Sequence, residues 1–252
     1  MKKDVLGIKI DDISILEIVR VVEGWLSEGN KHYIVTPNPE IVVMAQKDKV
    51  LKSIINNADL AIPDGVGLKL SGDIENISPG IEVMEGLVKL AAEKGFTTGF
   101  LGGRHGVAEK AAECLLLKYS NLKVSFASGE MEVDEGGNSI KYNVSSIEGK
   151  KQKDKSHYTL YTIPPTDLLF VAFGPPKQEK WIYKNLDKIP VKVVMGVGGA
   201  FDYLSGRVPR APQWVRRLGS EWLFRLIIQP WRIKRQLALI KYLWLITFDN
   251  RR

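Results

Sequence analysis

Short apolar runs alternate with longer helical patterns along most of this chain. Short runs of apolar and β-branched residues predict strands at residues 32–36, 59–63, 97–101, 123–126, 168–173 and 191–195. Helical patterns lie between several of them, with one helix starting at Glu40 and others over 82–94 and 107–119. This alternation predicts an α/β fold: a Rossmann-like, mostly parallel sheet with helices on both faces.

Each predicted strand ends in a loop of glycine, proline or small polar residues. In sheets of this kind, ligands bind in the crevice outside the carboxyl ends of the strands. We therefore expect one pocket, lined by the loops that begin at Thr36, Asp64, Gly102, Gly174 and Gly196.

Asp64 is the candidate catalytic base, because Pro63-Asp64-Gly65 places a carboxylate just past a strand. Gly65 would let a ligand approach the backbone closely, so we count it as substrate-binding. Pro-Asp-Gly is also a common turn, and a purely structural role for Asp64 is the alternative. The other candidate proton acceptors at this edge are Gln178, Glu179 and Asp202.

Thr36 and Asn38 offer a hydroxyl and an amide at the end of another predicted strand. Pro37 and Pro39 limit the freedom of this loop. We expect Thr36 to act in catalysis and Asn38 to bind substrate, both by orienting its hydroxyl groups. Helix capping is the alternative for Asn38.

The segment Gly174-Pro175-Pro176-Lys177-Gln178-Glu179 leads from a buried strand into the start of a helix. The free N–H groups of a first helical turn attract anions. We therefore predict that Gln178 positions substrate in the catalytic site. Lys177 and Glu179 are predicted to bind substrate beside it.

A glycine-rich loop, Gly196-Val197-Gly198-Gly199, follows the last predicted strand. A loop of this kind is what a binding site for a phosphate or a sugar diphosphate requires. A tight turn without a ligand is the alternative. It is not a dinucleotide fingerprint, because Phe201 stands where the third glycine would be. We predict substrate binding at Gly102, Gly196, Gly198, Gly199 and Asp202.

The last fifty residues carry all of the chain's net positive charge. Residues 203–252 hold eleven Lys and Arg against Glu221 and Asp249, a net charge of +9, so the remaining residues sum to −2 within the total of +7. A basic segment on a near-neutral body suggests a device for an anionic surface. We predict a catalytic domain over 1–205 and a membrane-associating helical appendage over 206–252.

The appendage has the pattern of amphipathic helices. Trp214, Leu218, Trp222 and Leu226 recur every four residues in a helix predicted over 213–228. Pro230 ends it, and a second basic, amphipathic pattern follows. We expect the tryptophans to lie at the headgroup depth of a bilayer.

Three arginines of the appendage are predicted to complete the pocket. A guanidinium grips phosphate oxygens in a bidentate way, so Arg217, Arg225 and Arg232 would hold a diphosphate. The alternative is a helical pair packed on the body with its arginines solvated.

The chain is expected to lie on a membrane without crossing it. A span needs about 18 to 20 apolar residues, and the best segment, 237–248, is too short and contains Lys241. The single cysteine, Cys114, indicates a reducing compartment. We predict a cytoplasmic protein, peripheral on the inner face of the cell membrane, with a mobile polar excursion over 128–155.

We predict no catalytic metal and no cofactor. There is no Asp-x-Asp clamp, since Asp11-Asp12 lies early in a segment typical of a turn or helix start. His32, His105 and His157 are too scattered to form a ligand set.

Nine blocks of sequence together resemble one bacterial enzyme family. The most specific are Gly-Pro-Pro-Lys-Gln-Glu-Lys-Trp at 174–181 and Gly-Val-Gly-Gly-Ala-Phe-Asp at 196–202. In this order they are similar to the WecG/TagA/CpsF glycosyltransferase family across nearly the whole chain. The full set is 36–40, 63–65, 79–82, 101–103, 170–181, 195–202, 206–212, 217–222 and 229–232.

The resemblance implies an enzyme that moves a sugar, typically N-acetylmannosamine or its uronic acid, from a UDP donor. The acceptor is N-acetylglucosamine linked to undecaprenyl diphosphate. The member that opens synthesis of the wall teichoic acid linkage unit is the nearest kind, so we expect an inverting UDP-N-acetylmannosamine transferase with Asp64 as base. The family also suggests a homo-oligomer. One departure is Asn76-Ile77-Ser78-Pro79, where family members place an arginine before the glycine matching Gly80.

Three alternatives remain. The same family accommodates other donors, such as UDP-N-acetylmannosaminuronic acid or a UDP-hexose, for polysaccharide synthesis. A nucleotide-dependent oxidoreductase would share the alternating strands, and a nicotinamide titration would reveal it. A nucleic-acid-binding module would use the basic, tryptophan-rich tail, and retention on anionic liposomes without binding to oligonucleotides would exclude it.

Overall fold

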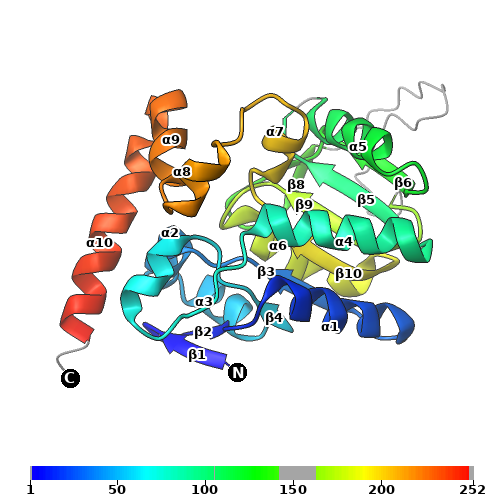
Figure 1. Cartoon of the computed structure of the whole chain (residues 1–252). Helices are drawn as coiled ribbons and strands as arrows, with labels where there is room; N and C mark the ends of the chain where they lie inside the picture. The colour runs from blue at the N-terminus through cyan, green and yellow to red at the C-terminus, as the bar shows by residue number, and fades with distance from the viewer. Residues whose placement is uncertain (1, 105, 142–162, 250–252) are drawn as a thin grey trace.

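A six-stranded sheet forms the centre of the computed structural model, which describes residues 2–104, 106–141 and 163–249 (Figure 1). Every pair of neighbouring strands is parallel. The predicted α/β class is confirmed, and the predicted strands match the observed ones to within two residues at each end. The strands lie in the order β4 (Leu60–Ala61), β3 (His32–Val35), β10 (Val191–Gly196), β9 (Thr166–Ala172), β5 (Thr97–Gly102) and β6 (Lys123–Ser128).

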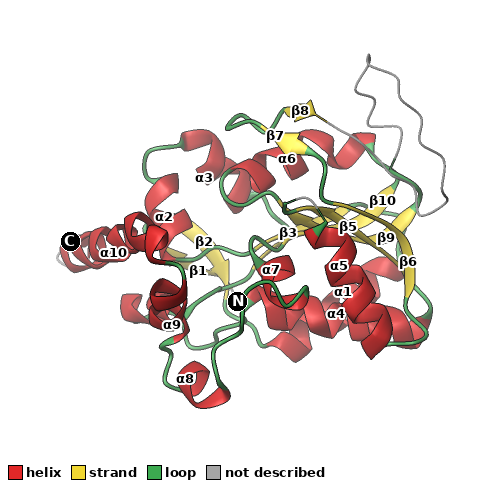
Figure 2. Cartoon of the chain, turned by 90° about the horizontal axis from the view of Figure 1, so that it is seen from above, coloured by secondary structure: helices red, strands yellow, loops and turns green. Residues whose placement is uncertain are grey.

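Helices cover both faces of this sheet (Figure 2). On one face, Ile34, Phe170 and Val193 are fully buried in a core shared with four helices. Because successive strand residues point to opposite faces, their neighbours along each strand fill the other core. The four helices of the first face are α1 (Ile15–Ser27), α4 (Gly80–Lys94), α5 (Val107–Lys118) and α7 (Ala200–Leu204).

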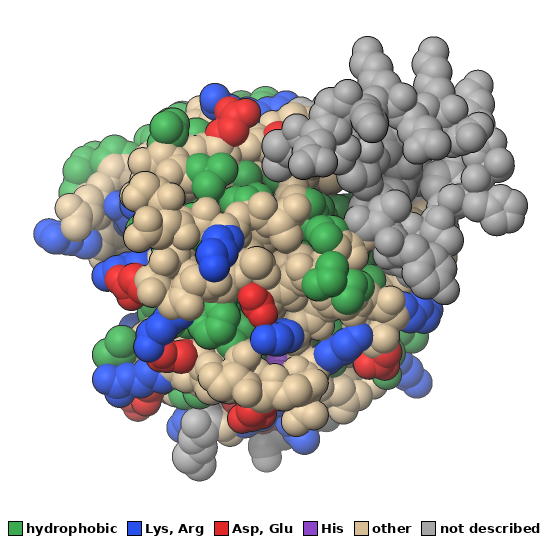
Figure 3. All heavy atoms as spheres, turned by 90° about the vertical axis from the view of Figure 1, so that its right-hand side faces the viewer, with side chains coloured by type: hydrophobic (Ala, Val, Ile, Leu, Met, Phe, Trp, Pro, Cys, Tyr) green, Lys and Arg blue, Asp and Glu red, His purple; other side chains and the backbone are tan. Residues whose placement is uncertain are grey.

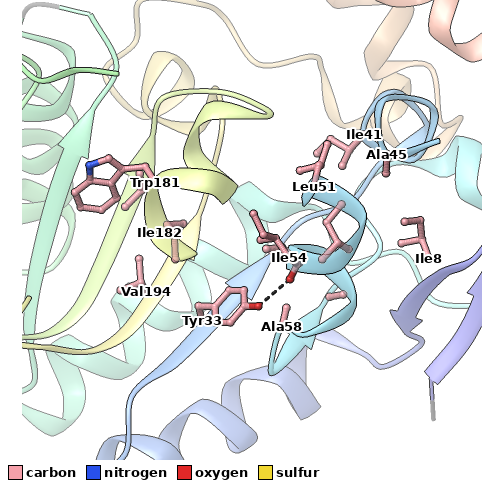
Figure 4. Close-up of a cluster of buried hydrophobic side chains, with 14 of the residues drawn as sticks. Ile8, Tyr33, Ile41, Ala45, Leu51, Ile54, Ala58, Trp181, Ile182 and Val194 are labelled. Carbon is pink, nitrogen blue, oxygen red and sulfur yellow. Dashed lines mark hydrogen bonds between the residues drawn. The ribbon is translucent and has the colours of Figure 1, made fainter. Parts of the chain in front are cut away.

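The opposite face packs against α2 (Pro39–Ala45), α3 (Lys49–Asn56) and α6 (Lys177–Asn185). Trp181 and Ile182 of α6 lie over Val194 of β10 (Figure 4). Beside them, the hydroxyl of Tyr33 donates a hydrogen bond to the carbonyl of Ile54 (2.8 Å). This bond satisfies a buried hydroxyl and ties α3 to the sheet.

Side-chain caps determine where three helices begin. Ser14 caps α1 in a capping box with Glu17. Asn38 and Asp48 accept hydrogen bonds from the first turns of α2 and α3. A 3-10 helix, η1 (Val66–Ser71), follows β4, and another, η3 (Leu186–Lys188), follows α6.

An N-terminal hairpin of β1 (Lys2–Val5) and β2 (Ile8–Asp11), which the sequence pattern does not predict, precedes α1. Asp11 accepts a hydrogen bond from the N–H of Ala61 (2.9 Å), and Asp12 accepts one from the N–H of Asn76 (2.8 Å). Both carboxylates therefore hold backbone segments in place.

The polar segment predicted over 128–155 contains a second hairpin, of β7 (Glu132–Val133) and β8 (Ser139–Lys141). Met131 and Val133 are buried, and the indole N–H of Trp181 donates to the Ser139 hydroxyl (3.2 Å). Residues 128–141 are thus packed on α6, unlike the predicted excursion. Residues 142–155 of that segment lie outside the described residues, as do His105 and His157.

The C-terminal segment forms α8 (Gln213–Arg217), α9 (Glu221–Ile228), η4 (Pro230–Arg232) and α10 (Ile233–Asp249). The single helix predicted over 213–228 is wrong. Gly219 divides it with a φ of 67°, a left-handed conformation that glycine adopts without steric cost. The break lets Gly219 lie against Val66 of η1.

Helix α10 packs on the body of the protein beside α2 (Figure 1). Tyr242 is fully buried and Ile246 nearly so, and both belong to the core around α2 and α3. Leu239 of the same helix approaches Gly67. Residues on both sides of the predicted boundary at 205 therefore share one core, and two separate domains stay a prediction.

The C-terminal helices expose many large apolar side chains. A concentration of exposed apolar side chains often marks an interaction site. In the part of the chain that the structure describes, no helix is long and apolar enough to cross a bilayer. Twelve of the twenty exposed large apolar side chains found there belong to this segment: Trp214, Leu218, Trp222, Leu223, Ile227, Trp231, Ile233, Leu237, Ile240, Leu243, Trp244 and Phe248.

The face turned away from these helices has a different character. On it, lysine and arginine side chains alternate with aspartate and glutamate, and no large area of one charge is visible (Figure 3). The surface of the α/β body on this side is that of an ordinary solvated protein.

Candidate functional site

Hydrogen bonds join the loops at the carboxyl edge of the sheet. The N–H of Asp64, after β4, donates to the carbonyl of Pro37, after β3 (2.9 Å). The hydroxyl of Thr36 donates to the carbonyl of Gly196 at the end of β10 (3.2 Å). Three loops from neighbouring strands therefore meet at one place.

The side chain of Gln178 links two more loops. Its Oε1 accepts hydrogen bonds from the N–H of Gly198, after β10 (3.0 Å), and from that of Gly174, after β9 (3.3 Å). The N–H of Gly103 in turn donates to the carbonyl of Ala172 (2.8 Å). The five predicted loops thus form one continuous rim, with Gly102 at the end farthest from Asp64.

Asp64 lies in this rim at the N-terminus of α4, where its Oδ1 accepts the N–H of Gly80 (3.2 Å). Burial raises the pKa of Asp64 to about 6. The Gly80 hydrogen bond and the charge of Arg225 act in the opposite direction, and the charge of Glu221 adds to the rise. A carboxylate with such a pKa is mostly ionised at neutral pH and is a stronger base than an ordinary aspartate.

Thr36 and Asn38 are placed differently from each other. Thr36 is buried, and its methyl group packs against Gly80 at the start of α4. Asn38 is half-buried, and its Oδ1 caps α2 by accepting the N–H of Ile41 (3.0 Å). The capping alternative therefore describes the Asn38 oxygen, and its contact with substrate stays a prediction.

Gln178 and Glu179 lie inside the rim, with 1% and 0% of their surface exposed. The Nε2 of Gln178 donates to the Oε1 of Glu179 (2.8 Å). Burial raises the pKa of Glu179 to about 7, and the Gln178 hydrogen bond lowers it. Lys177 points elsewhere, toward the β7–β8 turn, where it pairs with Glu135 (3.2 Å).

Arg225 of α9 lies over the glycine-rich loop. A Cβ at Gly199 would come within 2.6 Å of its Nη2, so glycine lets the guanidinium approach the backbone closely. The guanidinium also lies 4.0 Å from Asp202, and its Nε donates to Gln229 (3.3 Å). The C-terminal helices thereby deliver a cation to the loop that the sequence predicts to bind phosphate.

Tyr203 is a site residue that the sequence analysis missed. The Arg225 guanidinium stacks over its ring at 4.6 Å from the centroid. Burial raises the pKa of Tyr203, and the charges of Arg225 and Arg232 oppose the rise. Asp64 also acts on it, so Tyr203 lies within electrostatic range of both the base and the arginines. Its position next to Asp202 was the only signal in the sequence.

A second unpredicted cluster holds the C-terminal segment to α4. Glu82 accepts from Arg210 (2.6 Å) and Arg216 (3.2 Å), and Arg210 also lies 3.8 Å from Glu221. Because α4 also supplies Gly80 to the Asp64 carboxylate, this cluster connects the tail to the base.

The remaining predicted residues lie at the margins. Arg232 donates to Gln229 (3.3 Å), the amide that also holds Arg225. Arg217 is exposed and forms no ion pair within the described part of the chain. Gly65 follows Asp64 with open space where a side chain would stand.

Over residues 2–104, 106–141 and 163–249, no group of three or more His, Cys, Asp or Glu could hold a metal ion. His32 lies at the opposite end of β3 from Thr36, stacked on Trp25 at 4.3 Å and bonded to Asp59 (3.1 Å).

The rim combines two chemical capacities. Asp64 can accept a proton from a hydroxyl group, and Arg225 with the backbone of the Gly198–Gly199 turn can stabilise negative charge. A transfer reaction that deprotonates a nucleophile and releases an anionic leaving group needs both.

The sequence is similar to those of known proteins over most of its length. The family model described as glycosyl transferase WecG/TagA/CpsF matches residues 3–252. An N-acetylglucosaminyldiphosphoundecaprenol N-acetyl-beta-D-mannosaminyltransferase of Staphylococcus aureus (strain MRSA252) is 30% identical over 258 residues, covering 100% of this chain and 94% of that protein. A protein of the same name from Bacillus subtilis (strain 168) is 32% identical over 225 residues, covering 84% of this chain and 80% of its own.

Proposed function

Because the chain belongs to the WecG/TagA/CpsF glycosyl transferase family, we propose that it transfers N-acetylmannosamine from a UDP donor to N-acetylglucosaminyl-diphospho-undecaprenol. Relatives that match most of its length bear the name of this activity. The sugar in those names is β-linked, so transfer from an α-linked donor inverts the anomeric centre in one displacement. One base is then sufficient.

The observation that carries this proposal is the Asp64 carboxylate at the rim, with its pKa raised to about 6. As the acceptor hydroxyl attacks, its oxygen bonds to the anomeric carbon and its proton passes to Asp64. The bond from that carbon to the diphosphate breaks, and the electron pair leaves with UDP. A base whose pKa lies just below neutral is ionised and still basic enough for this step.

Arg225 stabilises the negative charge that develops on the leaving group. Its guanidinium lies against Gly199 and beside Asp202, where the β-phosphate of UDP would replace the carboxylate as its partner. A guanidinium binds phosphate oxygens through two parallel hydrogen bonds. Arg232 shares the Gln229 anchor and adds positive charge. We assign Arg217 to the same diphosphate in the liganded enzyme.

Thr36 and Gln178 position the reacting groups. Thr36 connects the Asp64 side of the rim to Gly196, and Gln178 connects Gly198 to Gly174. A fixed rim lowers the entropic cost of bringing donor and acceptor together. Gly65, Gly102, Lys177 and Asn38 remain in our assignment as substrate-binding residues.

The acceptor's polyprenyl chain requires the enzyme to work at a membrane surface. The apolar outward side of the C-terminal helices supplies the contact, with Trp214, Trp231 and Trp244 each more than half exposed. Tryptophan favours the bilayer interface, and basic residues favour anionic lipid. The UDP donor places the reaction at the inner face of the cell membrane, and assembly as a homo-oligomer stays our expectation.

A donor screen tests this function. The full-length protein is incubated with a water-soluble diphosphate-linked N-acetylglucosamine analogue and each of several UDP-sugars, and UDP release and product mass are measured. We expect turnover with UDP-N-acetylmannosamine and a product heavier by one N-acetylhexosamine residue. Turnover only with a UDP-hexose or the uronic acid would keep the family and reject this donor. Absence of transfer from every donor would reject the proposal.

A further inference from the structure

Both polar atoms of the Gln178 amide are already engaged by the protein. The oxygen accepts from Gly198 and Gly174, and the nitrogen donates to Glu179. With 1% of its surface exposed, Gln178 lies beneath the rim and against Gly196. It therefore acts on the loops more directly than on a ligand.

Glu179 is a buried acid that has no ion-pair partner among the described residues. Its Oε1 accepts from Gln178, and its Oε2 has no hydrogen-bond partner in the described part of the chain. The nearest cation in sequence, Lys180, pairs with Asp48 instead (2.7 Å). Burying a carboxyl without an ion-pair partner is unfavourable, and an apolar side chain at this position would be more stable. The presence of Glu179 therefore indicates that its carboxylate oxygen, as an acceptor for Gln178, has a function.

We propose that Glu179 is a positioning residue that acts through Gln178. An amide side chain has nearly the same shape after a 180° flip, but its donor and acceptor exchange places. A flipped Gln178 would turn its N–H groups toward the N–H groups of Gly174 and Gly198. The ionised form of a carboxylate accepts hydrogen bonds and donates none, so ionised Glu179 opposes the flip and reinforces the orientation that holds both loops.

This selection reaches the ligand-facing side of the rim. Gly198 precedes Gly199, which lies under the Arg225 guanidinium. A freed Gln178 would loosen the turn that sets the distance from this backbone to a diphosphate. The consequence for UDP rests on the proposed function, whereas the state of the two loops does not.

Three substitutions at this position test the need for an acceptor that cannot donate. Glu179→Met removes the acceptor, Glu179→Asp keeps the carboxylate but shortens its reach to Gln178, and Glu179→Gln keeps an acceptor oxygen but adds an amide donor. We expect UDP affinity, measured by calorimetry at pH 8 on the full-length protein, to fall about tenfold or more in all three variants. Removing a residue that orients a metal ligand typically costs 10- to 100-fold in affinity or activity, and we expect a loss of the same order here.

Amide hydrogen exchange gives a readout that needs no ligand. Peptides containing Gly174 and Gly198 should exchange faster in Glu179→Met and Glu179→Asp than in the parent. On a Gln178→Met background, Glu179→Met should add no further change in exchange or in UDP affinity, because the two residues act in series.

Asn185→Leu is the matched control. Asn185 is also a buried polar residue of α6, where its Nδ2 donates to the carbonyl of Trp181 (2.8 Å), away from the rim. It should lower the melting temperature without changing UDP affinity or exchange at Gly198. Parental affinity and exchange in Glu179→Asp, or an equal effect of Glu179→Met with and without Gln178, would overturn the inference. A parent that binds no UDP would reject the proposed function instead, and hydrogen exchange would still decide the role of Glu179.

Discussion

Asp64 carries a cost to the fold that only its chemistry explains. Its carboxyl is more acidic in water than in the rim, where burial raises its pKa to about 6. At neutral pH it is nevertheless mostly ionised, and it faces a loop edge that backbone hydrogen bonds hold in place.

Asp64→Asn should lower turnover by about 10²- to 10⁴-fold, because the amide keeps the shape of the side chain but cannot take a proton. In the parent, kcat/KM should fall as the pH drops below about 6, where the base becomes protonated. Steady-state rates between pH 5 and 9 measure both. Turnover of the variant within a few fold of the parent would exclude Asp64 as the base.

The same substitution should stabilise the protein above pH 6. The pKa of Asp64 is raised in the folded state, so its neutral form favours folding and its ionisation opposes folding. The opposing effect is absent below about pH 4 and complete above about pH 6, where it is worth at most about 3 kcal/mol. Melting temperatures of parent and Asp64→Asn should agree at pH 4 and diverge at pH 8 in favour of the variant. A variant that is less stable at pH 8 would contradict this account.

At the scale of elements, α9 is attached to α7 through Arg225. The guanidinium stacks on Tyr203, and two other protein groups, Asp202 and Gln229, hold its edges. This attachment places α9 beside Asp64. Glu221 of α9 raises the pKa of Asp64, and Arg225 of α9 lowers it.

Arg225→Lys should reduce kcat/KM about 10- to 100-fold, since lysine keeps the charge but loses the planar fork and the ring contact. Vesicle binding should remain near the parental level. Arg207→Lys is the control, because Arg207 is an exposed arginine of the same segment. Equal activity in the two variants would show that the geometry of Arg225 is unimportant.

Helix α10 belongs to the core through one of its faces only. Tyr242→Ala should destabilise the protein by about 3 to 5 kcal/mol, because it leaves a cavity between α10 and α2. Trp244→Ala, two residues along the same helix, removes a side chain that is 59% exposed and should cost less than about 0.5 kcal/mol. Chemical denaturation of the two variants tests the difference, and similar losses would mean that α10 is not docked as described.

At the scale of the whole molecule, the exposed apolar side of the C-terminal helices gives the protein two unlike surfaces. The opposite face carries mixed charges (Figure 3), whereas this side carries tryptophans among arginines. An asymmetric molecule of this kind would meet a membrane in one orientation.

Replacing Trp214, Trp231 and Trp244 together by glutamine should abolish co-sedimentation with anionic vesicles. Each tryptophan loses its favourable partition to the interface. Turnover of a water-soluble acceptor should persist, because none of the three is a predicted site residue. The matched control replaces Leu16, Val50 and Leu117, exposed apolar residues of α1, α3 and α5, and should leave vesicle binding intact. Equal binding by both triple variants would place the membrane contact elsewhere.

Much of the fold and part of the site follow from local pattern. The continuous apolar run 168–173 and the run 191–195, which only Lys192 interrupts, predict buried parallel strands, because a strand covered on both faces has few polar side chains. The place of Asp64 in the site is also predictable. It comes directly after a short strand, and parallel strands bring their carboxyl ends to one edge of the sheet. The basic, tryptophan-rich composition of the tail likewise predicts its exposed surface.

Contacts between elements that are distant in the sequence set which side chains meet. A periodicity of four suits a helix over 213–228, yet contact with Val66 favours the break at Gly219. Which atom of the Gln178 amide faces Gly198 depends on Glu179 and on the spacing of β9 and β10, which no local stretch of sequence contains. Tyr203 stacks under the Arg225 guanidinium only because α9 packs beside α7. Local sequence encodes the period and polarity of each element, whereas contacts between distant elements depend on how the packed layers fit together.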